Sequence, residues 1–223
     1  MSLSHQGIGM TSRRTRERMV SRLKNQGIRN TAVLDVMSRT PRHIFIEEAL
    51  SSRAYDDTAL PIGYSQTISQ PYVVARMTEA LLQNGIPDKV LEVGTGCGYQ
   101  TAILAQLVSK VYTVERISAL QQLARKHWRS LCLRNIQYKH SDGGWGWEQY
   151  ALYDGILVTA APVEIPPSLL EQMALDATLV IPVGEHHQQE LKRVVRKDNE
   201  YTSETIDRVK FVPLRSGCTQ ASV

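Results

Sequence analysis

From residue 89 onward, short apolar runs alternate with segments of helical pattern, and this alternation constrains the fold more than any other feature of the chain. Strands that alternate with helices call for a parallel sheet covered by helices on both faces. Two β-rich segments at the end have no helix between them, which predicts an antiparallel hairpin at the sheet edge. The sequence therefore predicts an α/β fold with a doubly wound, mostly parallel sheet. The predicted strands are KVLEV, KVYTVE, IQYKH, YDGILVTA and ATLVIPVG, followed by QELKRVVRK and DRVKFVPL.

The first third of the chain has a different pattern, which predicts an N-terminal helical addition. In YVVARMTEALLQ, four apolar residues share one helical face: Val73, Met77, Ala80 and Leu81. The segment before it, RAYDDTALPIGYSQTISQP, is rich in turn formers. We interpret residues 1–9 as a tag or disordered extension and residues 10–223 as one domain, with a helical part at 10–84 and an α/β core at 85–217. Further helices are predicted over residues 11–26, 31–37 and 42–50, from the glycine-rich loop to about 108, and over 117–131 and 166–174.

Composition and cysteine spacing limit the class of protein. Of the 223 residues, 42% are hydrophobic, but no apolar run approaches the ~18 residues that span a bilayer. The N-terminus lacks the apolar core of a signal peptide, so we expect a cytoplasmic protein without a membrane partner. The cysteines Cys97, Cys132 and Cys218 are odd in number and far apart, which argues against disulfides and a zinc site. His186 and His187 are adjacent, and adjacent strand residues face opposite ways. We therefore expect no metal.

Positive charge is concentrated at the N-terminus. The net charge is +4, and residues 1–30 contain seven basic residues but only one acidic residue, Glu17. Such an arm can contact nucleic acid. The solvated face of a helix is the commoner explanation, and the rest of the chain has no basic stripe. We therefore expect no nucleic-acid partner.

A glycine-rich loop, GTGCG, follows the first predicted strand. In doubly wound folds, this position lies at the carboxyl ends of the strands, where ligands bind. The order G-x-G-x-G differs from the dinucleotide fingerprint G-x-G-x-x-G, because Tyr99 occupies the sixth place. The loop also lacks the Gly-Lys-Ser/Thr ending of a phosphate-binding loop. Tight strand-to-helix turns use glycine in any case, so the loop alone does not identify the ligand.

Three acidic residues at the ends of consecutive predicted strands narrow the choice. Glu92 lies two residues before Gly94 and suits an ammonium group better than a pyrophosphate. Glu115 ends the second strand, at a spacing where a carboxylate can accept hydrogen bonds from two ribose hydroxyls. Asp142 follows the third strand and is positioned to accept a hydrogen bond from an adenine amino group. Each is also explained by an exposed or capping carboxylate, but the three together favour an adenosine with a cationic amino-acid tail, which is S-adenosylmethionine.

This combination resembles the class I S-adenosylmethionine-dependent methyltransferases. The segments ALPIGYSQTISQPYVVARMTEAL, VLEVGTGCGYQTAILA, YTVERI, YDGILVTAAPVEIPPSLLEQM and LVIPVGEHHQQELKRV are more specifically similar to bacterial protein-L-isoaspartate (D-aspartate) O-methyltransferases. The resemblance covers about residues 10–217 and implies a Rossmann-like methyltransferase fold. Two positions depart from the family pattern, because Ser65 and Ser141 stand where glycine is usual.

The resemblance also implies which residues form the site. Ser69 corresponds to the catalytic serine of the family. Since proline prefers the first helical turn, Pro71 makes Gln70 the helix cap and leaves the Ser69 hydroxyl outside the helix, free to orient a substrate. The implied cofactor-binding residues are Thr67, Ile68, Glu92, Gly94, Thr95, Gly96, Gly98, Glu115, Asp142 and Gly143.

The expected activity is methyl transfer from S-adenosyl-L-methionine, with S-adenosyl-L-homocysteine as product. The acceptor implied by the resemblance is the free α-carboxylate of L-isoaspartyl residues in damaged proteins and peptides, whose esterification initiates repair through a succinimide. A carboxylic acid is already ionised at neutral pH, so no strong general base is needed. A monomer is the favoured state. The alternatives are a class I methyltransferase acting on nucleic acid or a small molecule, and a non-catalytic nucleotide-fold binding protein.

Overall fold

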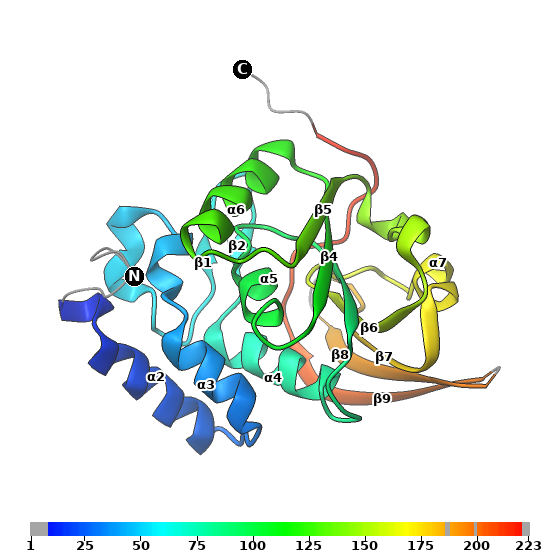
Figure 1. The fold of residues 1–223 in the computed structure, drawn as a ribbon, viewed down its shortest axis with the longest axis horizontal. Helices are drawn as coiled ribbons and strands as arrows, with labels where there is room; N and C mark the ends of the chain where they lie inside the picture. Colours follow the sequence, from blue (N-terminus) through cyan, green and yellow to red (C-terminus); the bar gives the residue numbers. More distant parts are fainter. Residues whose placement is uncertain (1–8, 186–187, 199, 220–223) are drawn as a thin grey trace.

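The computed structural model describes residues 9–185, 188–198 and 200–219. His186, His187 and residues 1–8 of the predicted extension lie outside the described residues. At its centre is a seven-stranded sheet with the order β5-β4-β3-β6-β7-β8-β9 (Figure 1). The strands are β3 (Lys89–Val93), β4 (Lys110–Glu115), β5 (Ile136–His140), β6 (Tyr153–Val158), β7 (Met173–Val183), β8 (Gln189–Lys197) and β9 (Glu200–Val209).

The sheet has the predicted mixture of strand directions. The five strands β5 to β7 pair in parallel, and β8 and β9 add an antiparallel hairpin at the β7 edge. The chain runs outward from β3 to β4 and β5, then returns to place β6 on the other side of β3. The strand order therefore reverses between β3 and β6, where doubly wound folds bind their ligands. The predicted fold class is confirmed.

Helices cover both faces of the sheet because neighbouring residues of each strand face opposite ways. Val90 belongs to an apolar cluster that contains Met77 and Leu104, whereas its neighbour Leu91 belongs to a cluster that contains Leu169. The first face is thus covered by α4 (Pro71–Leu81) and α5 (Tyr99–Leu104), and the second by α7 (Pro167–Glu171). The helix α6 (Ser118–Ser130) connects β4 to β5. Two short 3-10 helices, η4 (Gly143–Trp145) and η5 (Glu148–Tyr150), follow β5.

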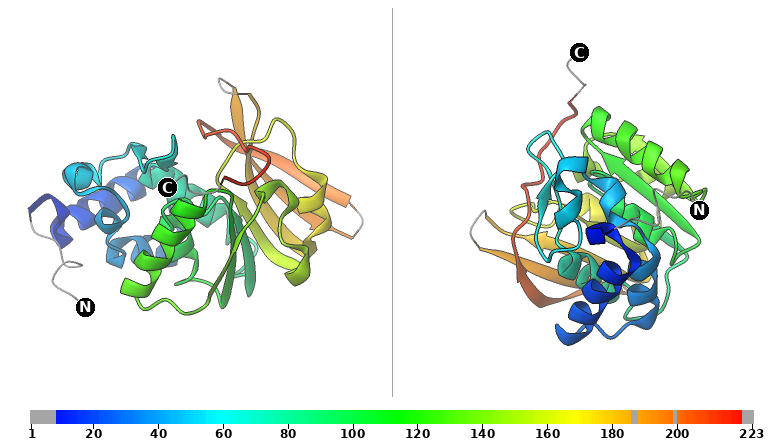
Figure 2. Two further views of the ribbon diagram at one scale, coloured as in Figure 1. Left: turned by 90° about the horizontal axis from the view of Figure 1, so that it is seen from above. Right: turned by 90° about the vertical axis from the view of Figure 1, so that its left-hand side faces the viewer.

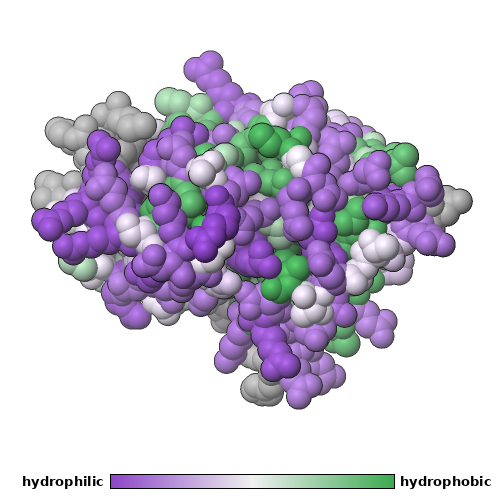
Figure 3. Space-filling view, turned by 90° about the horizontal axis from the view of Figure 1, so that it is seen from below, coloured by the Kyte–Doolittle hydropathy of each residue, from purple (hydrophilic) through white to green (hydrophobic). Residues whose placement is uncertain are grey.

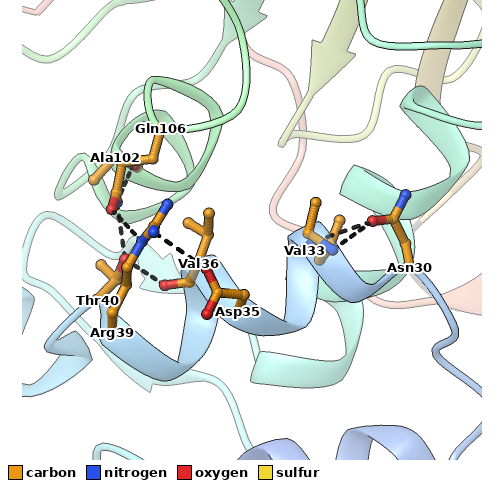
Figure 4. A network of polar contacts seen from close by, with 9 residues as sticks. Asn30, Val33, Asp35, Val36, Arg39, Thr40, Ala102 and Gln106 are labelled. Carbon is orange, nitrogen blue, oxygen red and sulfur yellow. Dashed lines mark hydrogen bonds and ion pairs between the residues drawn. The ribbon is translucent and has the colours of Figure 1, made fainter.

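The N-terminal part packs on the helical layer at the end of the molecule opposite the β8–β9 hairpin (Figure 2). It contains η1 (Gly9–Thr11), α2 (Arg13–Asn25), α3 (Thr31–Arg39), η2 (Arg42–Phe45) and η3 (Glu48–Arg53). Its apolar residues share one cluster with α5 and α6 residues of the core. A polar network also joins α3 to α5 (Figure 4): the Gln106 amide donates to the Thr40 hydroxyl at 2.9 Å and accepts from Arg39 at 3.3 Å.

Several elements differ from the sequence prediction. The helix predicted over 166–174 ends at Glu171, where β7 soon follows at Met173, and the helix predicted to about 108 ends at Leu104. The helix predicted over 42–50 is two 3-10 turns, because Ile46 between them is extended. The turn-rich segment contains a small antiparallel pair, β1 (Leu60–Pro61) and β2 (Thr67–Ile68). The last strand is predicted at 207–214. In the structure the last strand is β9, at Glu200–Val209, and it pairs with β8 along its length. Residues 210–214 instead leave the sheet, and Pro213 forms a bridge with Ala161 at the end of β6.

The surface is predominantly polar on the face seen in Figure 3, where hydrophobic side chains gather in small separate patches. No helix in the described part of the chain combines the length and the apolar character needed to cross a membrane.

Candidate active site

The glycine loop connects β3 to α5 at the point where the strand order reverses. Gly94 has a φ of +94° and donates its N–H to the Val114 carbonyl at 2.9 Å. A Cβ on Gly94 would collide with the Thr159 hydroxyl, which donates to the Gly94 carbonyl at 2.6 Å. A side chain at this position is therefore excluded both by backbone conformation and by space. The loop consequently keeps its backbone accessible at the end of the sheet.

A cavity opens over this loop and is walled by four segments distant in sequence. The β2–α4 connection forms one side, the ends of β3 and β4 form its floor, and residues 212–215 close it from the C-terminal end. Its volume is about 90 Å³, below the ~300 Å³ of typical ligand sites, so a nucleoside-sized ligand requires part of this wall to move outward. The predicted site residues that line it are Thr67, Ile68, Ser69, Gly94, Thr95, Gly96, Glu115 and Gly143.

Glu115 presents its carboxylate at the cavity from the end of β4. One carboxylate oxygen accepts from the Gly96 N–H at 2.8 Å and the other from the Ile117 N–H at 2.8 Å. Burial raises the pKa of Glu115, while these backbone donors lower it. Each carboxylate oxygen has two lone pairs, so both retain capacity for a further donor. The side chain thus shapes the loop and can also accept hydrogen bonds from two neighbouring hydroxyls.

Glu92 does not line the cavity. It is fully buried under the loop, where one carboxylate oxygen accepts from the Thr101 hydroxyl at 2.5 Å and the Thr113 hydroxyl at 2.6 Å. Burial raises the pKa of Glu92 to about 8. The Thr113 hydroxyl also lies 2.6 Å from that of Thr95, which faces the cavity. Glu92 is therefore connected to the cavity through two hydroxyls, and its contact with an ammonium group stays a prediction.

Asp142 and Gly98 also have structural roles, and the capping role was one of the two explanations that the sequence left open for Asp142. The two carboxylate oxygens of Asp142 accept from the Gly144 N–H at 2.8 Å and from the Gly217 N–H at 2.6 Å. The first contact caps η4 and the second holds the C-terminal segment over the cavity. The Gly98 carbonyl accepts from the Trp128 indole at 2.9 Å, and a Cβ on Gly98 would overlap that ring. Neither residue lines the cavity, and the adenine contact of Asp142 stays a prediction.

Ser69 lies directly before α4. Gln70 is the N-cap and Pro71 the first helical residue, as predicted. The half-buried Ser69 hydroxyl has no hydrogen-bond partner among the residues that the structure describes. Asp57 stabilises the helix start instead, because its carboxylate accepts from the Tyr72 N–H at 2.9 Å. The hydroxyl of Ser69 is therefore available to a ligand.

Arg42 fixes the backbone at Ser69 from below. Its guanidinium is fully buried and donates to the Ser69 carbonyl at 2.7 Å and the Ala54 carbonyl at 2.8 Å. It also lies 4.9 Å from the centre of the Tyr99 ring. Burial lowers the pKa of Arg42, and its interaction with Tyr99 opposes this effect. No signal in the sequence indicates this role, because the contacts of Arg42 with Ala54 and Ser69 lie 12 and 27 positions away in the chain.

A second, larger space adjoins the cavity. This cleft has a volume of about 780 Å³ and runs between the start of α4 and the β8–β9 hairpin. Ser69, Thr67, Thr159 and Val212 line both spaces. The shared border places the Ser69 hydroxyl where a ligand in the cavity and a ligand in the cleft would meet.

The described residues contain no alternative catalytic constellation at this border. Cys97 lines the cavity, but burial raises the pKa of its thiol to about 11. His127 contacts the Cys97 backbone carbonyl at 2.9 Å and not its sulfur. Within the described ranges, no group of three or more His, Cys, Asp or Glu residues could hold a metal ion. The site therefore lacks an activated thiol nucleophile. The groups left to hold a substrate are neutral donors such as the Ser69 hydroxyl and the backbone.

Comparisons with known proteins find relatives along nearly the whole chain. The family model of protein-L-isoaspartate(D-aspartate) O-methyltransferase matches residues 14–219. The protein-L-isoaspartate O-methyltransferase of Cellvibrio japonicus is 58% identical over 216 residues, which cover 95% of this chain and 96% of that protein. The enzyme of the same name from Alcanivorax borkumensis is 56% identical over 217 residues, 97% of this chain and 99% of that protein. A putative protein-L-isoaspartate O-methyltransferase from Plasmodium falciparum, solved in complex with S-adenosyl-L-homocysteine, is 25% identical with a TM-score of 0.79 and covers 90% of this chain and 98% of that one.

Proposed function

Because the chain belongs to the protein-L-isoaspartate(D-aspartate) O-methyltransferase family, we propose that it methylates the free α-carboxylate of L-isoaspartyl residues in damaged proteins. The cofactor is S-adenosylmethionine and the product S-adenosyl-L-homocysteine, the molecule bound in the Plasmodium falciparum relative. We assign the roles within the site from one observation. The cavity and the cleft share a border, and the free Ser69 hydroxyl lies on it.

The residues of the cavity suit this cofactor. Glu115 offers two carboxylate oxygens for the ribose hydroxyls, and the glycine loop offers backbone without side chains. The bound cofactor supplies a methyl group on a positively charged sulfur. The chain itself needs to supply no strong base, since the acceptor carboxylate is ionised at neutral pH.

Catalysis by this site is then chiefly a matter of positioning. The acceptor oxygen has to be held about 3 Å from the methyl carbon, in line with the departing sulfur. In our proposal the Ser69 hydroxyl donates a hydrogen bond to the substrate carboxylate and so fixes its orientation. Arg42 acts as a positioning residue, because its two backbone contacts hold the Ser69 segment against η3. Attraction between opposite charges assists assembly but fades as they neutralise, so geometry determines the rate.

The ester then reacts without the enzyme. The neighbouring backbone nitrogen attacks the ester carbonyl, methanol leaves and a succinimide forms, whose hydrolysis returns some normal aspartate. An enzyme that repairs damaged proteins must accept substrates of many sequences. The wide cleft beside Ser69 fits this requirement.

We place this reaction in the cytoplasm and do not assign a nucleic-acid partner. Two of the seven basic residues at the N-terminus support the second point, because Arg16 is buried and Arg22 donates to the Tyr55 carbonyl at 2.6 Å. These arginines hold α2 against the protein and are not presented as a free arm.

The test is methylation of an L-isoaspartyl peptide beside its normal aspartyl twin, followed with labelled S-adenosylmethionine. We expect label in the isoaspartyl peptide alone, as a base-labile ester. Labelling of RNA in place of the peptide would support the nucleic-acid alternative, and cofactor binding without transfer to either would support a binding protein.

A further inference from the structure

The cleft beside Ser69 carries an uneven charge. Four charged side chains line it, and they come from the last two strands and the residue after them: Glu190, Lys192, Arg208 and Lys210. Three are cationic and one is anionic. The walls formed by α4 and by the end of β6 contribute only neutral side chains, among them Gln70 and Thr159.

The one acidic side chain is already engaged within the hairpin. The Glu190 carboxylate lies 3.5 Å from the Lys192 ammonium and accepts from the Thr205 hydroxyl at 3.2 Å. Glu190 also stands directly opposite Arg208 in the β8–β9 register. Its one ion pair in the described residues is with Lys192, and three cations against one anion leave the lining of the cleft with a net positive charge.

Arg208 and Lys210 are exposed, and neither forms an ion pair with any residue in the described ranges. The nearest acid in sequence, Asp207, is held by the Tyr72 hydroxyl at 3.0 Å and does not line the cleft. The two cations flank the route along residues 208–212, which ends at the border with the cavity. An extended peptide that places its reacting residue at Ser69 passes beside them.

We propose that this cleft selects isoaspartyl sites with acidic neighbours. Arg208 and Lys210 are the specificity-determining residues, and the ligand is the negatively charged flank of the damaged peptide. The inference rests on the proposed function, since it concerns the same acceptor site. The physical basis is complementary charge across a partly exposed contact, which acts on encounter and affinity and weakens with salt.

The experiment uses three peptides that share one L-isoaspartyl centre and differ only in flanking residues, which are glutamate, glutamine or lysine at the same positions. KM is measured with the complete enzyme at low and high ionic strength. We expect KM to be about three- to tenfold lower for the glutamate peptide than for the lysine peptide at low salt, as two partly exposed charge contacts imply. The ratio should shrink at high salt.

Variants assign the effect to the two side chains. In the Arg208→Gln/Lys210→Gln double variant the KM ratio should fall to about one, and in Arg208→Glu/Lys210→Glu it should invert. Lys197→Gln is the matched control, because Lys197 is an exposed cation on β8 that does not line the cleft, and it should keep the parent ratio.

Equal KM values for all three peptides would overturn the inference while leaving the proposed function intact. If the KM ratio between the lysine and glutamate peptides is unchanged in the Arg208→Gln/Lys210→Gln variant, the inference is overturned as well. If none of the three peptides is methylated, the proposed function itself fails.

Discussion

At the scale of single residues, the site contains three polar side chains that differ in their hydrogen-bond partners and in their burial. Ser69 has a free hydroxyl on a backbone that the buried Arg42 holds in place. Glu115 has one carboxylate oxygen engaged with the glycine loop at Gly96 and the other with the Ile117 N–H, and it still faces the cavity. Glu92 is buried where its charge is disfavoured. Each arrangement leads to a separate expectation for substitution.

Replacing Ser69 by alanine removes the hydroxyl but leaves the backbone contact with Arg42. We expect kcat to fall roughly tenfold to a thousandfold, because the acceptor loses an orienting hydrogen bond worth about 1.5–3 kcal/mol and its alignment. Cofactor affinity, measured by calorimetry, should be nearly unchanged. Full turnover in Ser69→Ala would remove Ser69 from the mechanism. Ser168→Ala, a change of another serine outside both spaces, serves as control.

Replacing Glu115 by alanine should weaken S-adenosylmethionine by about 1–3 kcal/mol, since charged hydrogen bonds to the ribose are lost. Calorimetry measures this change. The variant also loses the contacts with the Gly96 and Ile117 N–H groups, so thermal unfolding without cofactor is needed to separate backbone damage from lost ligand contacts. Unaltered binding would refute the ribose assignment.

Glu92 makes stability depend on pH. A carboxyl whose pKa is raised from 4.5 to about 8 in the folded protein binds more protons there than in the unfolded chain. It therefore contributes stability that is fully present below about pH 4.5 and is lost as pH rises toward 8. Glu92→Gln keeps the neutral shape at every pH, so its unfolding free energy should rise relative to the parent between pH 5 and pH 7.5. Urea titrations at both pH values provide the measurement, and parallel pH profiles would contradict it.

At the scale of elements, the connection between β1 and β2 adopts a backbone conformation that its residues disfavour. The turn between β1 and β2 places Ser65 at a φ of +55°, where a side chain costs about 1–2 kcal/mol. Glycine, which the family resemblance leads us to expect at this position, avoids that cost. The other serine in place of glycine, Ser141, is absent from the described non-glycine residues with positive φ. Of the two departures from the family pattern, Ser65 therefore carries a conformational cost and Ser141 does not.

Ser65→Gly should stabilise the protein by up to about 1 kcal/mol, since relief of the left-handed conformation exceeds the added entropy of the unfolded chain. Ser141→Gly should bring no such gain and is the matched control. Thermal unfolding of both variants decides the point, and an equal response would show that the turn at Ser65 is not strained.

At the scale of the whole molecule, the helical N-terminal part and the α/β core share one apolar cluster. Met19 and Leu23 of α2 belong to the same cluster as Ile103 of α5 and Trp128 of α6. Burial of this kind couples the stability of the two parts, because neither can separate without exposing apolar surface to water. The cluster thus supports the interpretation of residues 10–223 as one domain.

One cooperative unfolding transition is the expected result. Tryptophan fluorescence follows the core, since all three tryptophans lie at positions 128, 145 and 147. Far-UV circular dichroism also follows the N-terminal helices. Urea unfolding curves from the two probes should coincide, whereas an earlier change in circular dichroism would mean that the helical part unfolds separately.

The sequence was most informative where structure follows from local patterns. Alternating strands and helices predicted the sheet, and Pro71 predicted the helix start beside Ser69. Contacts between distant segments were not predictable: Arg42 reaches Ser69 across 27 positions, and residues 212–215 close a cavity built on β3 and β4. Residues 211–214 look like the continuation of a strand because they are apolar. Only Phe211 is buried, and the segment lies beyond the end of β6, where Pro213 forms a bridge with Ala161.

That C-terminal segment forms part of the wall between the two spaces, because Val212 lines both of them. On both sides of Pro213 it is fixed to one residue, since the Ala161 N–H donates to the Val212 carbonyl and the Ala161 carbonyl accepts from the Leu214 N–H, each at 2.8 Å. Beyond Arg215 it is held by Asp142 and Arg116 through Gly217, and by backbone contacts of Thr219. The shared wall at Val212 is therefore fastened from both directions along the chain.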